Sequence, residues 1–215
     1  MIELDLREGW VGPELASEFP ELGLTYTPVE AGPGKTSREV KRRLRALADR
    51  YTGGKVIHMR QDPVPWAYRV FYRQVGIDPD SQRTPAEGVA LERLRAGGFQ
   101  SRNNVDDALT IAVAETGVPV IALDGDSCGR AIGLRLAAED ERLGPTRPLS
   151  ARQIVVADED RPLAVLFGEI ALDAGVTPAT RRMLLTALKV KGVPAISVEE
   201  ALWIAAETLM GDGTA

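Results

Sequence analysis

The residues able to carry covalent chemistry are few, because the 215-residue chain contains one cysteine, Cys128, and one histidine, His58. A single cysteine excludes an internal disulfide, and with only one histidine beside it no zinc site of the usual Cys/His kind can form. No G-x-S-x-G nucleophile elbow occurs. Cys128 would be a nucleophile only beside His58, and nothing in the sequence places the two together. We therefore expect no metal and no cofactor, and any catalysis must rest on positioning, carboxylates or backbone amides.

A second candidate is a polar cluster where a helix is predicted to start, at Arg102, Asn103, Asn104 and Asp107. Free amides at a helix N-terminus attract anions and carbonyl oxygens, and Arg102 could hold a carboxylate or phosphate with two hydrogen bonds. The alternative interpretation is structural. In this interpretation an asparagine caps the helix, and the helix dipole stabilises the acidic side chains in its first turn. Arg102 then pairs with one of those acids. Both interpretations remain open.

Three other motifs favour plain structure. The Gly34-Lys35-Thr36 triplet matches the last three residues of the phosphate-binding loop motif, but Val29 occupies the position where that motif requires its first glycine. It predicts a turn before a capped helix. Asp124-Gly125-Asp126 predicts a turn, because the twelve-residue calcium pattern is absent. The bend at residues 60–66 is either a pocket rim or ordinary packing of prolines against a tryptophan.

Charge is uneven along the chain. The formal net charge is −5, which argues against strong nonspecific binding of nucleic acid. Seven bases nevertheless crowd the segment 35–50. This segment is either a local basic face or the solvated side of an amphipathic helix. Apolar residues make up 44% of the chain, as is typical of globular proteins, and no apolar run approaches the roughly 18 residues of a membrane span. The N-terminus lacks the apolar stretch of a signal peptide, so we expect a cytoplasmic protein.

Periodicity and capping signals predict the elements of the first half. Strands are expected at 2–6, 22–29 and 55–59. Helices are expected at 12–18, 66–75, 84–97 and 103–117, and a further one begins at a Thr36/Glu39 capping box. In the helix at 66–75, Trp66, Val70 and Phe71 should face inward.

The second half is richer in strands. They are expected at 120–123, 131–136, 153–157 and 163–167, while 183–190 is ambiguous and a Ser197/Glu200 capping box opens the last helix. We predict one compact α+β domain, with β-sandwich-like sheets and flanking helices. Residues 1–55 would pack on a core of 56–202, and 203–215 would end the last helix.

One long stretch resembles a known family. GGFQSRNNVDDALTIAVAETGVPVIALD is similar to the core of the B-three/B-four editing domain of the phenylalanyl-tRNA synthetase beta subunit, and VVADEDRPLAVLFGEI resembles its later hairpin. The matching positions are Asn104, Val105, Asp107, Glu115, Gly117, Pro119, Asp124, Ala164 and Gly168. The resemblance covers roughly residues 56–202, and the stretch YRQVGIDPDSQRTPAEGVALERL looks like the extension of free-standing members.

The resemblance implies a domain that binds the acylated end of transfer RNA carrying a wrong amino acid, chiefly tyrosine, and hydrolyses the ester. The family uses no protein nucleophile and positions a water instead. Its pocket histidine, threonine and hydroxyl-reading glutamate correspond here to Ile121, Leu109 and Thr186. A pocket built to read a hydroxyl needs polar groups, so these replacements imply a more apolar ligand than tyrosine.

Two functions of different classes follow. The first is a free-standing editing-like hydrolase that acts on mischarged aminoacyl-tRNA in trans and is no ligase by itself. The second is a non-catalytic module that binds an amino acid, a related small molecule or tRNA. A purely structural role in a complex is a third. The expected pocket is lined by Leu109, Ile121, Ala164, Gly168 and Thr186.

Overall fold

Pairing between residues far apart in the sequence organises the chain. The computed structural model describes residues 2–145 and 147–212. Strand β2 (Gly23–Val29) pairs antiparallel along its whole length with β9 (Met183–Lys189). These two are the second and third strands of a seven-stranded sheet of order β3-β9-β2-β1-β4-β7-β8. The remaining strands of this sheet are β1 (Arg7–Val11), β3 (Val120–Asp124), β4 (Gly133–Leu136), β7 (Ile154–Ala157) and β8 (Pro162–Val165).

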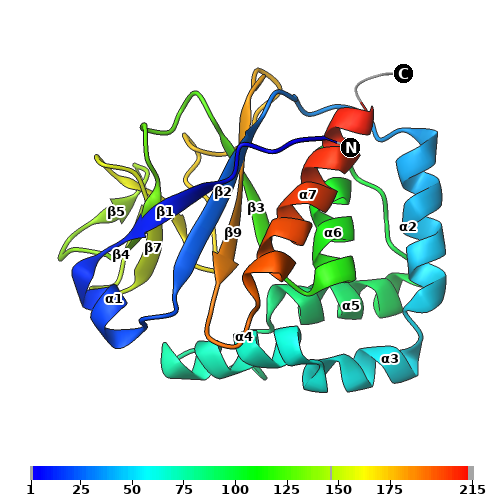
Figure 1. Ribbon diagram of the computed structural model, residues 1–215, viewed down its shortest axis with the longest axis horizontal. Helices are drawn as coiled ribbons and strands as arrows, with labels where there is room; N and C mark the ends of the chain where they lie inside the picture. The colour runs from blue at the N-terminus through cyan, green and yellow to red at the C-terminus, as the bar shows by residue number, and fades with distance from the viewer. Residues whose placement is uncertain (1, 146, 213–215) are drawn as a thin grey trace.

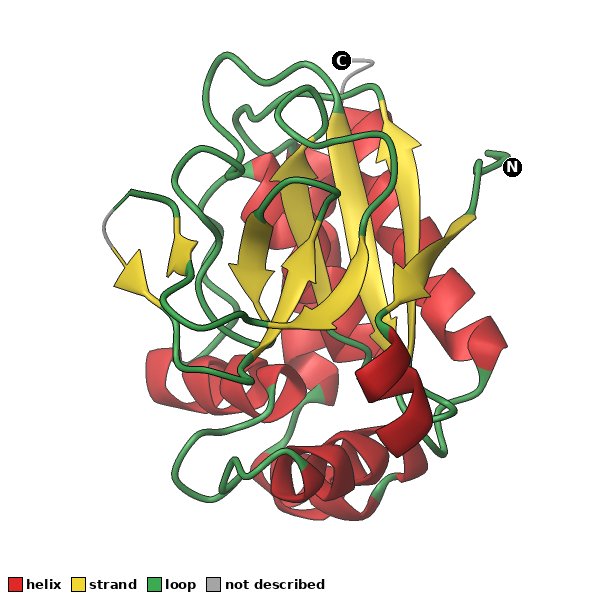
Figure 2. Ribbon diagram, turned by 90° about the vertical axis from the view of Figure 1, so that its left-hand side faces the viewer, coloured by secondary structure: helices red, strands yellow, loops and turns green. Residues whose placement is uncertain are grey.

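The sheet curls, so that its two edges are joined by one segment. Among the described strands, β1 and β4 form the one parallel pair. After β8 the chain returns along that strand, with Ala171 N donating to Leu163 O at 2.8 Å. It then reaches β3, where Asp124 N donates to Ala174 O at 2.9 Å. Strands β5 (Arg142–Leu143) and β6 (Arg147–Pro148) make a separate small ribbon. Figure 2 shows the curled strands in front of a layer of helices.

Helices α6 (Asn104–Thr116) and α7 (Ala195–Asp212) pack on each other and on the strands β3, β9 and β2 (Figure 1). Asn103 caps α6 by accepting a hydrogen bond from Asp106 N at 2.9 Å. Gly117 ends α6 with a φ of +77°, a conformation that other residues adopt at a cost. A side chain at position 117 would also meet the ring of Pro65. The cap and the glycine together fix where β3 begins.

A second set of helices packs partly on α6 and partly on one another. It comprises α2 (Arg38–Arg50), α3 (Gly53–His58), the short 3-10 helix η1 (Met59–Gln61), α4 (Pro63–Gln74) and α5 (Pro85–Ala96). The short α1 (Pro13–Glu18) lies against β4. Thr84 and Glu87 form a capping box at the start of α5, and Gly97 ends it with a φ of +72°. The expected single α+β domain is confirmed, and the ambiguous segment 183–190 is a strand.

Two predicted strands were wrong. Residues 2–6 alternate like a strand, but the strand starts only at Arg7, where a partner strand is available. Residues 55–59 are helical. Thr52 caps that helix by accepting from Lys55 N at 3.3 Å, and this local bond outweighs the short apolar run.

Three details of the predicted helices were also wrong. Ser37, and not Thr36, caps α2 by accepting from Val40 N at 3.2 Å. The last helix already starts at Ala195, before Ser197. On α4, Trp66 and Val70 are partly exposed, because Tyr68, Phe71 and Tyr72 take the inward face.

The division at residues 55 and 202 stays a prediction. Residues 1–55 contribute β1 and β2 to the same sheet as the later strands. Among the described helices, none combines the length and the apolar character needed to cross a bilayer.

Candidate functional site

The polar cluster at the start of α6 holds two loops in place. The Asp107 side chain, 1% exposed, accepts from Thr36 Oγ1 and Ser101 Oγ, both at 2.6 Å, and from Arg102 N at 3.0 Å. Asn104 accepts from Gly34 N at 2.6 Å and donates to Gly32 O at 3.1 Å. The side chains of Asn104 and Asp107 therefore connect α6 by hydrogen bonds to the Gly32–Thr36 turn and to the segment before the helix.

Arg102 lies beside this cluster with its side chain largely in solvent, where it pairs with Glu92 of α5. The hollow between Arg102, Asp107 and Phe99 has a volume of about 30 Å³. A space of this size holds roughly one water molecule. In this structure the cluster has no room for an amino acid.

Ile121 and Thr186 are brought together by the register of the sheet. Ile121 of β3 is the cross-strand partner of Thr186 of β9, Thr186 is the partner of Tyr26 of β2, and Tyr26 is the partner of Arg7 of β1. Directly opposed residues in antiparallel strands point to the same face. Arg7, Tyr26, Thr186 and Ile121 thus form one row across four strands, which we call the cross-strand row.

The middle of the cross-strand row is buried, and its two ends are more open. Tyr26 and Thr186 are 5% and 2% exposed, whereas Ile121 is half-buried and Arg7 is exposed. The Thr186 hydroxyl has no hydrogen-bond partner among the residues that the structure describes. Burying a hydroxyl unpaired costs about 1–3 kcal/mol, so a ligand that bonds to it would recover this energy.

The other three expected pocket residues lie on different elements. Leu109 is half-buried on α6, which packs on β3. Ala164 is buried on β8, and the register through β1, β4 and β7 places it on the same face of the curled sheet as Thr186. Gly168 is exposed in the turn after β8. The hollows of about 540 and 530 Å³ on the surface are lined by other residues.

Two aromatic side chains link the turn at Gly168 to β9. The Tyr68 hydroxyl of α4 donates to Leu188 O at 2.5 Å, and its ring meets the Phe167 ring edge-on at 6.1 Å between centroids. Phe167 has a φ of +55°, a left-handed conformation that costs a non-glycine residue about 1–2 kcal/mol. Its ring also lies 4.6 Å from that of Tyr72. Burial raises the pKa of Tyr68 well above its ordinary value, so the hydroxyl stays protonated and donates.

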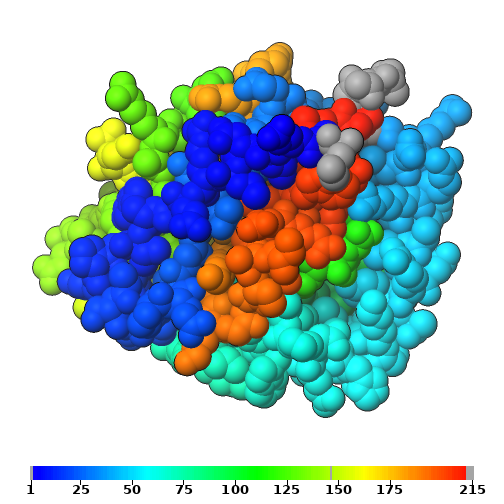
Figure 3. Space-filling model, viewed as in Figure 1, coloured from blue at the N-terminus to red at the C-terminus, as the bar shows by residue number. Residues whose placement is uncertain are grey.

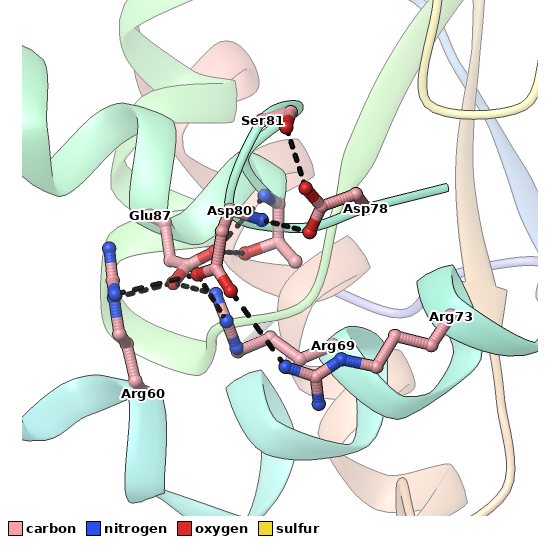
Figure 4. A network of polar contacts seen from close by, with 8 residues as sticks. Arg60, Arg69, Arg73, Asp78, Asp80, Ser81 and Glu87 are labelled. Carbon is pink, nitrogen blue, oxygen red and sulfur yellow. Dashed lines mark hydrogen bonds and ion pairs between the residues drawn. The ribbon is translucent and has the colours of Figure 1, made fainter. Parts of the chain in front are cut away.

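Helix α4 is itself held by a network of charges (Figure 4). Arg69, 4% exposed, donates to Glu87 Oε1 and to Asp80 Oδ1, both at 2.6 Å. Arg60 reaches the same Glu87 oxygen at 2.9 Å. Thr84 donates to the other Glu87 oxygen from its backbone and its hydroxyl. One buried carboxylate thus joins the segment before α4, the helix itself and the start of α5.

The charges of this network support one another. Burial alone would lower the pKa of the Arg69 guanidinium, but its bonds to Asp80 and the nearby charge of Glu87 outweigh burial and raise it. The hydrogen bond from Arg69 holds the pKa of Asp80 below its ordinary value. Arg69 and Asp80 therefore stay ionised at neutral pH, and Arg60 is occupied by a structural ion pair with Glu87.

Cys128 and His58 lie on separate elements and share no contact. The Cys128 thiol follows β3 and donates to Asp124 O at 3.2 Å, while His58 is exposed on α3. Burial, followed by the nearby Asp158, raises the pKa of Cys128 to about 12. The thiol is therefore protonated at neutral pH and is a poor nucleophile. Glu115, at the end of α6, pairs with Arg43 at 2.9 Å.

Comparison with known proteins identifies the fold's relatives. A profile of the B3/4 domain matches residues 67–199, which is more than half of the chain. The chain belongs to the B3/4 domain family. The phenylalanine–tRNA ligase beta subunit of Moorella thermoacetica is 37% identical over 97 residues, which are 43% of this chain and 12% of that protein. The corresponding subunit of Yersinia pestis is 35% identical over 100 residues, 44% of this chain and 12% of the relative.

The beta subunit of a Synechococcus strain is 30% identical over 128 residues, which cover 54% of this chain and 16% of the relative. The chain thus spans only about an eighth to a sixth of these relatives. The match confirms the family resemblance seen in the sequence. Residues 1–66, including β1, β2 and α2, lie outside the matched B3/4 region.

Sequence reasoning missed several residues near the expected site. Tyr26 and Arg7 join the cross-strand row only through strand pairing, which no local pattern reveals. Tyr68 and Arg69 lie on a helix whose inward face was assigned to other positions. The Thr84/Glu87 capping box was a signal for the buried carboxylate, because a Glu at that position already has a fixed local partner.

Proposed function

We propose that this chain hydrolyses the ester of mischarged aminoacyl-tRNA in trans, with an aminoacyl group of low polarity held at the Ile121–Thr186 end of the cross-strand row. Aminoacyl-tRNA is a cytoplasmic substrate, which agrees with the localisation expected from the sequence. The family assignment supports this substrate class, since the relatives are beta subunits of phenylalanine–tRNA ligase.

The observation that carries this proposal is the direct pairing of Ile121 with Thr186. The family resemblance assigns a histidine and a hydroxyl-reading glutamate to these two positions, and here they face the same side of the sheet. The Thr186 hydroxyl, which has no partner among the described residues, provides one hydrogen bond beside the alkyl side chain of Ile121. Such a site favours an apolar side chain and penalises a strongly polar one, whose groups would go unpaired.

The chemistry must rely on a bound water. The buried thiol of Cys128 is protonated, and the cross-strand row supplies a guanidinium, a phenol, a hydroxyl and an alkyl group. Holding a water and an ester in attack geometry accelerates hydrolysis through positioning alone. Deacylation would then depend on the tRNA end being bound rather than on an activated side chain.

The lack of a carboxylate or imidazole in the cross-strand row favours the second function, a module that binds without cleaving. Tyr68 and Phe167, which occupy the space between β9 and the Gly168 turn, agree with either function. The binding module would recognise an amino acid, a related small molecule or the acylated tRNA end through the same residues. The two functions differ only in whether the ester is lost.

A panel of mischarged tRNAs separates them. The purified chain is incubated with tRNAs carrying alanine, valine, leucine, phenylalanine or tyrosine, and the ester half-life is measured. The proposal expects a shortened half-life for an apolar aminoacyl group and little effect on tyrosine. Unchanged half-lives across the panel would rule out the hydrolase, and ligand-dependent thermal stabilisation without deacylation would establish the binding module.

Two threonines provide a matched pair of variants. Thr27 and Thr186 are both buried on neighbouring strands with unpaired hydroxyls, but Thr27 pairs with Leu185 and therefore faces the opposite side. Thr186→Val removes the proposed ligand contact, and Thr27→Val removes only a hydroxyl. Each change should leave stability about equal or slightly higher, since an unpaired group is lost. Only Thr186→Val should weaken kcat/KM or binding, by about 3- to 10-fold, the value of one hydrogen bond.

A further inference from the structure

Helix α2 carries a row of cations on its solvent side. Arg38, Lys41, Arg42 and Arg45 follow the spacing i, i+3, i+4 and i+7, which places them along one face of a helix. Val40, Leu44 and Leu47 form the opposite, buried face. We call these four cations the basic stripe. All four are exposed, and α2 forms the outer margin of the molecule farthest from β5 (Figure 3).

The basic stripe has little internal compensation. Within the part of the chain that the structure describes, Arg38, Lys41 and Arg45 take part in no ion pair, and Arg42 has only a loose, exposed contact with Glu39 at 3.8 Å. The cations on the flank of the same helix differ. Arg43 is held by Glu115 at 2.9 Å. On α2, the half-buried Arg43 thus has a close carboxylate partner, whereas Arg38, Lys41 and Arg45 face solvent with no ion pair among the described residues.

The stripe does not stabilise the helix. Arg38 and Arg42, and likewise Lys41 and Arg45, are like charges four residues apart, and such pairs disfavour a helix by about 0.2–0.5 kcal/mol each. Arg38 also lies in the first turn, where the helix dipole disfavours cations. The repulsion within the basic stripe destabilises the free protein, and an anionic partner that neutralises these charges would account for the presence of the stripe.

The stripe contrasts with the rest of the chain. The segment 35–50 contains seven bases and two acids, a net charge of +5, whereas the other residues contain 19 bases and 29 acids, a net charge of −10. The segment lies outside the matched B3/4 region. On an acidic molecule, a local concentration of positive charge such as this helix attracts polyanions to that part of the surface.

The helix is fixed relative to the candidate site. Tyr51, at the end of α2, donates from its hydroxyl to Ala114 O of α6, and Arg93 of α5 donates to Ala48 O at 2.7 Å. At the other end, Thr36 is bound to Asp107 of α6. Because α6 also carries Leu109, a polyanion bound on α2 has a defined position relative to the proposed aminoacyl site.

We propose that the basic stripe binds the phosphate backbone of tRNA and so supplies the RNA contact of the proposed function, on which this inference rests. Guanidinium groups suit phosphate oxygens because they donate two parallel hydrogen bonds. The four cations span about 10 Å of helix axis, at a rise of about 1.5 Å per residue. The contact reads charge and spacing, so it is independent of the tRNA sequence.

The test uses deacylated tRNA, so that binding is measured without any ester. Fluorescence anisotropy gives the Kd between about 50 and 200 mM salt for the wild type, for R38Q/K41Q/R45Q, and for the control R83Q/R95Q/R130Q. The control removes three exposed arginines that also take part in no ion pair among the described residues, and it changes the net charge equally. Glutamine favours helices, so α2 should remain folded, and circular dichroism checks this.

Four phosphate contacts predict that the affinity of the wild type falls about 100-fold over this salt range. The stripe variant should bind at least about 10-fold more weakly at the lowest salt, with the salt slope reduced by about three, whereas the control should keep the wild-type slope. Equal losses in both variants, or no loss in the stripe variant, would overturn the proposal. So would competition by polyglutamate as effective as that by unlabelled tRNA, because the surface would then bind acidic polypeptides as well.

Failure of this inference can be told apart from failure of the hydrolase. Binding of deacylated tRNA through the stripe without ester cleavage leaves the stripe proposal intact and removes the hydrolase. The opposite outcome is ester cleavage that does not need the stripe: the stripe variant then deacylates aminoacyl-tRNA as fast as the wild type, even at a subsaturating concentration of tRNA. The site then works without the stripe, and the inference fails alone.

Discussion

Removing the Glu87 carboxylate should cost this protein a large part of its stability. The two oxygens of this side chain, 3% exposed, accept from Arg69 at 2.6 Å, Arg60 at 2.9 Å and twice from Thr84. Taking one partner from a buried ion pair typically costs about 3–5 kcal/mol. Arg69 keeps its second partner, Asp80, so we expect about 3 kcal/mol for Glu87→Ala.

For a chain of this length, 3 kcal/mol corresponds to a Tm lowered by roughly 6–12 °C. Urea unfolding followed by tryptophan fluorescence gives the free energy, provided that the m-value is unchanged. Glu92→Ala is the matched control. Its ion pair with Arg102 is exposed, so the loss should stay below about 1 kcal/mol.

Replacing both buried partners tests the reasoning further. R69M/E87M removes the unpaired charge as well as the pair, and exchanging a buried pair for apolar groups is often neutral. The double variant should therefore be more stable than Glu87→Ala alone. A cost below 1 kcal/mol for Glu87→Ala, or a double variant less stable than the single one, would refute the account of the network.

Three further predictions concern other parts of the fold. With its pKa raised to about 12, Cys128 should react with iodoacetamide at pH 8 at least ~100-fold more slowly than free cysteine, and rapid labelling would contradict its burial. Burial alone would raise the pKa of Asp158, but backbone N–H groups of Arg161, Asp160 and Gly129 lower it below the ordinary value. The ionised Asp158 carboxylate therefore stabilises the fold at pH values above its ordinary pKa of about 3.9, and this stabilisation is lost as the pH falls below that value. In unfolding titrations, the stability of Asp158→Asn should therefore fall less steeply with acid than that of the wild type. Asp107→Ala leaves three donors unpaired and should cost about 2–4 kcal/mol and speed hydrogen exchange in the 32–36 turn. Unchanged exchange there would show that the turn is held by other contacts.

Elements with their own start and stop signals could be predicted from the sequence. The α5 helix has a capping box and a terminal glycine, and α6 has Asn103 and Gly117 at its two ends. The bounds of both helices could therefore be predicted from local signals alone. The strand at 120–123 followed because Pro119 and Gly117 exclude a longer helix. The family resemblance also rested on this same ordered stretch.

Elements that depend on a distant partner could not be predicted. Residues 2–6 have the alternation of a strand, but pairing begins only where β2 and β4 lie beside the chain. The cross-strand row has the same origin, since Tyr26 and Ile121 are 95 positions apart in the sequence and are joined only through β9. Five of the expected site residues could be named from the resemblance, but Tyr68 and Phe167, which meet beside the Gly168 turn, carry no local signal.

The position of the aminoacyl group can be measured directly. With isoleucine, leucine and threonine methyl groups labelled, methyl NMR follows the addition of a non-hydrolysable amide analogue of leucyl-adenosine. The methyl signals of Ile121, Thr186 and Leu109 should shift together with a common Kd. The shifts of Ile121 and Leu109 should be reduced in Thr186→Val but kept in Thr27→Val. Saturable shifts confined to other methyl groups, with Ile121 and Thr186 unmoved, would contradict the proposed site.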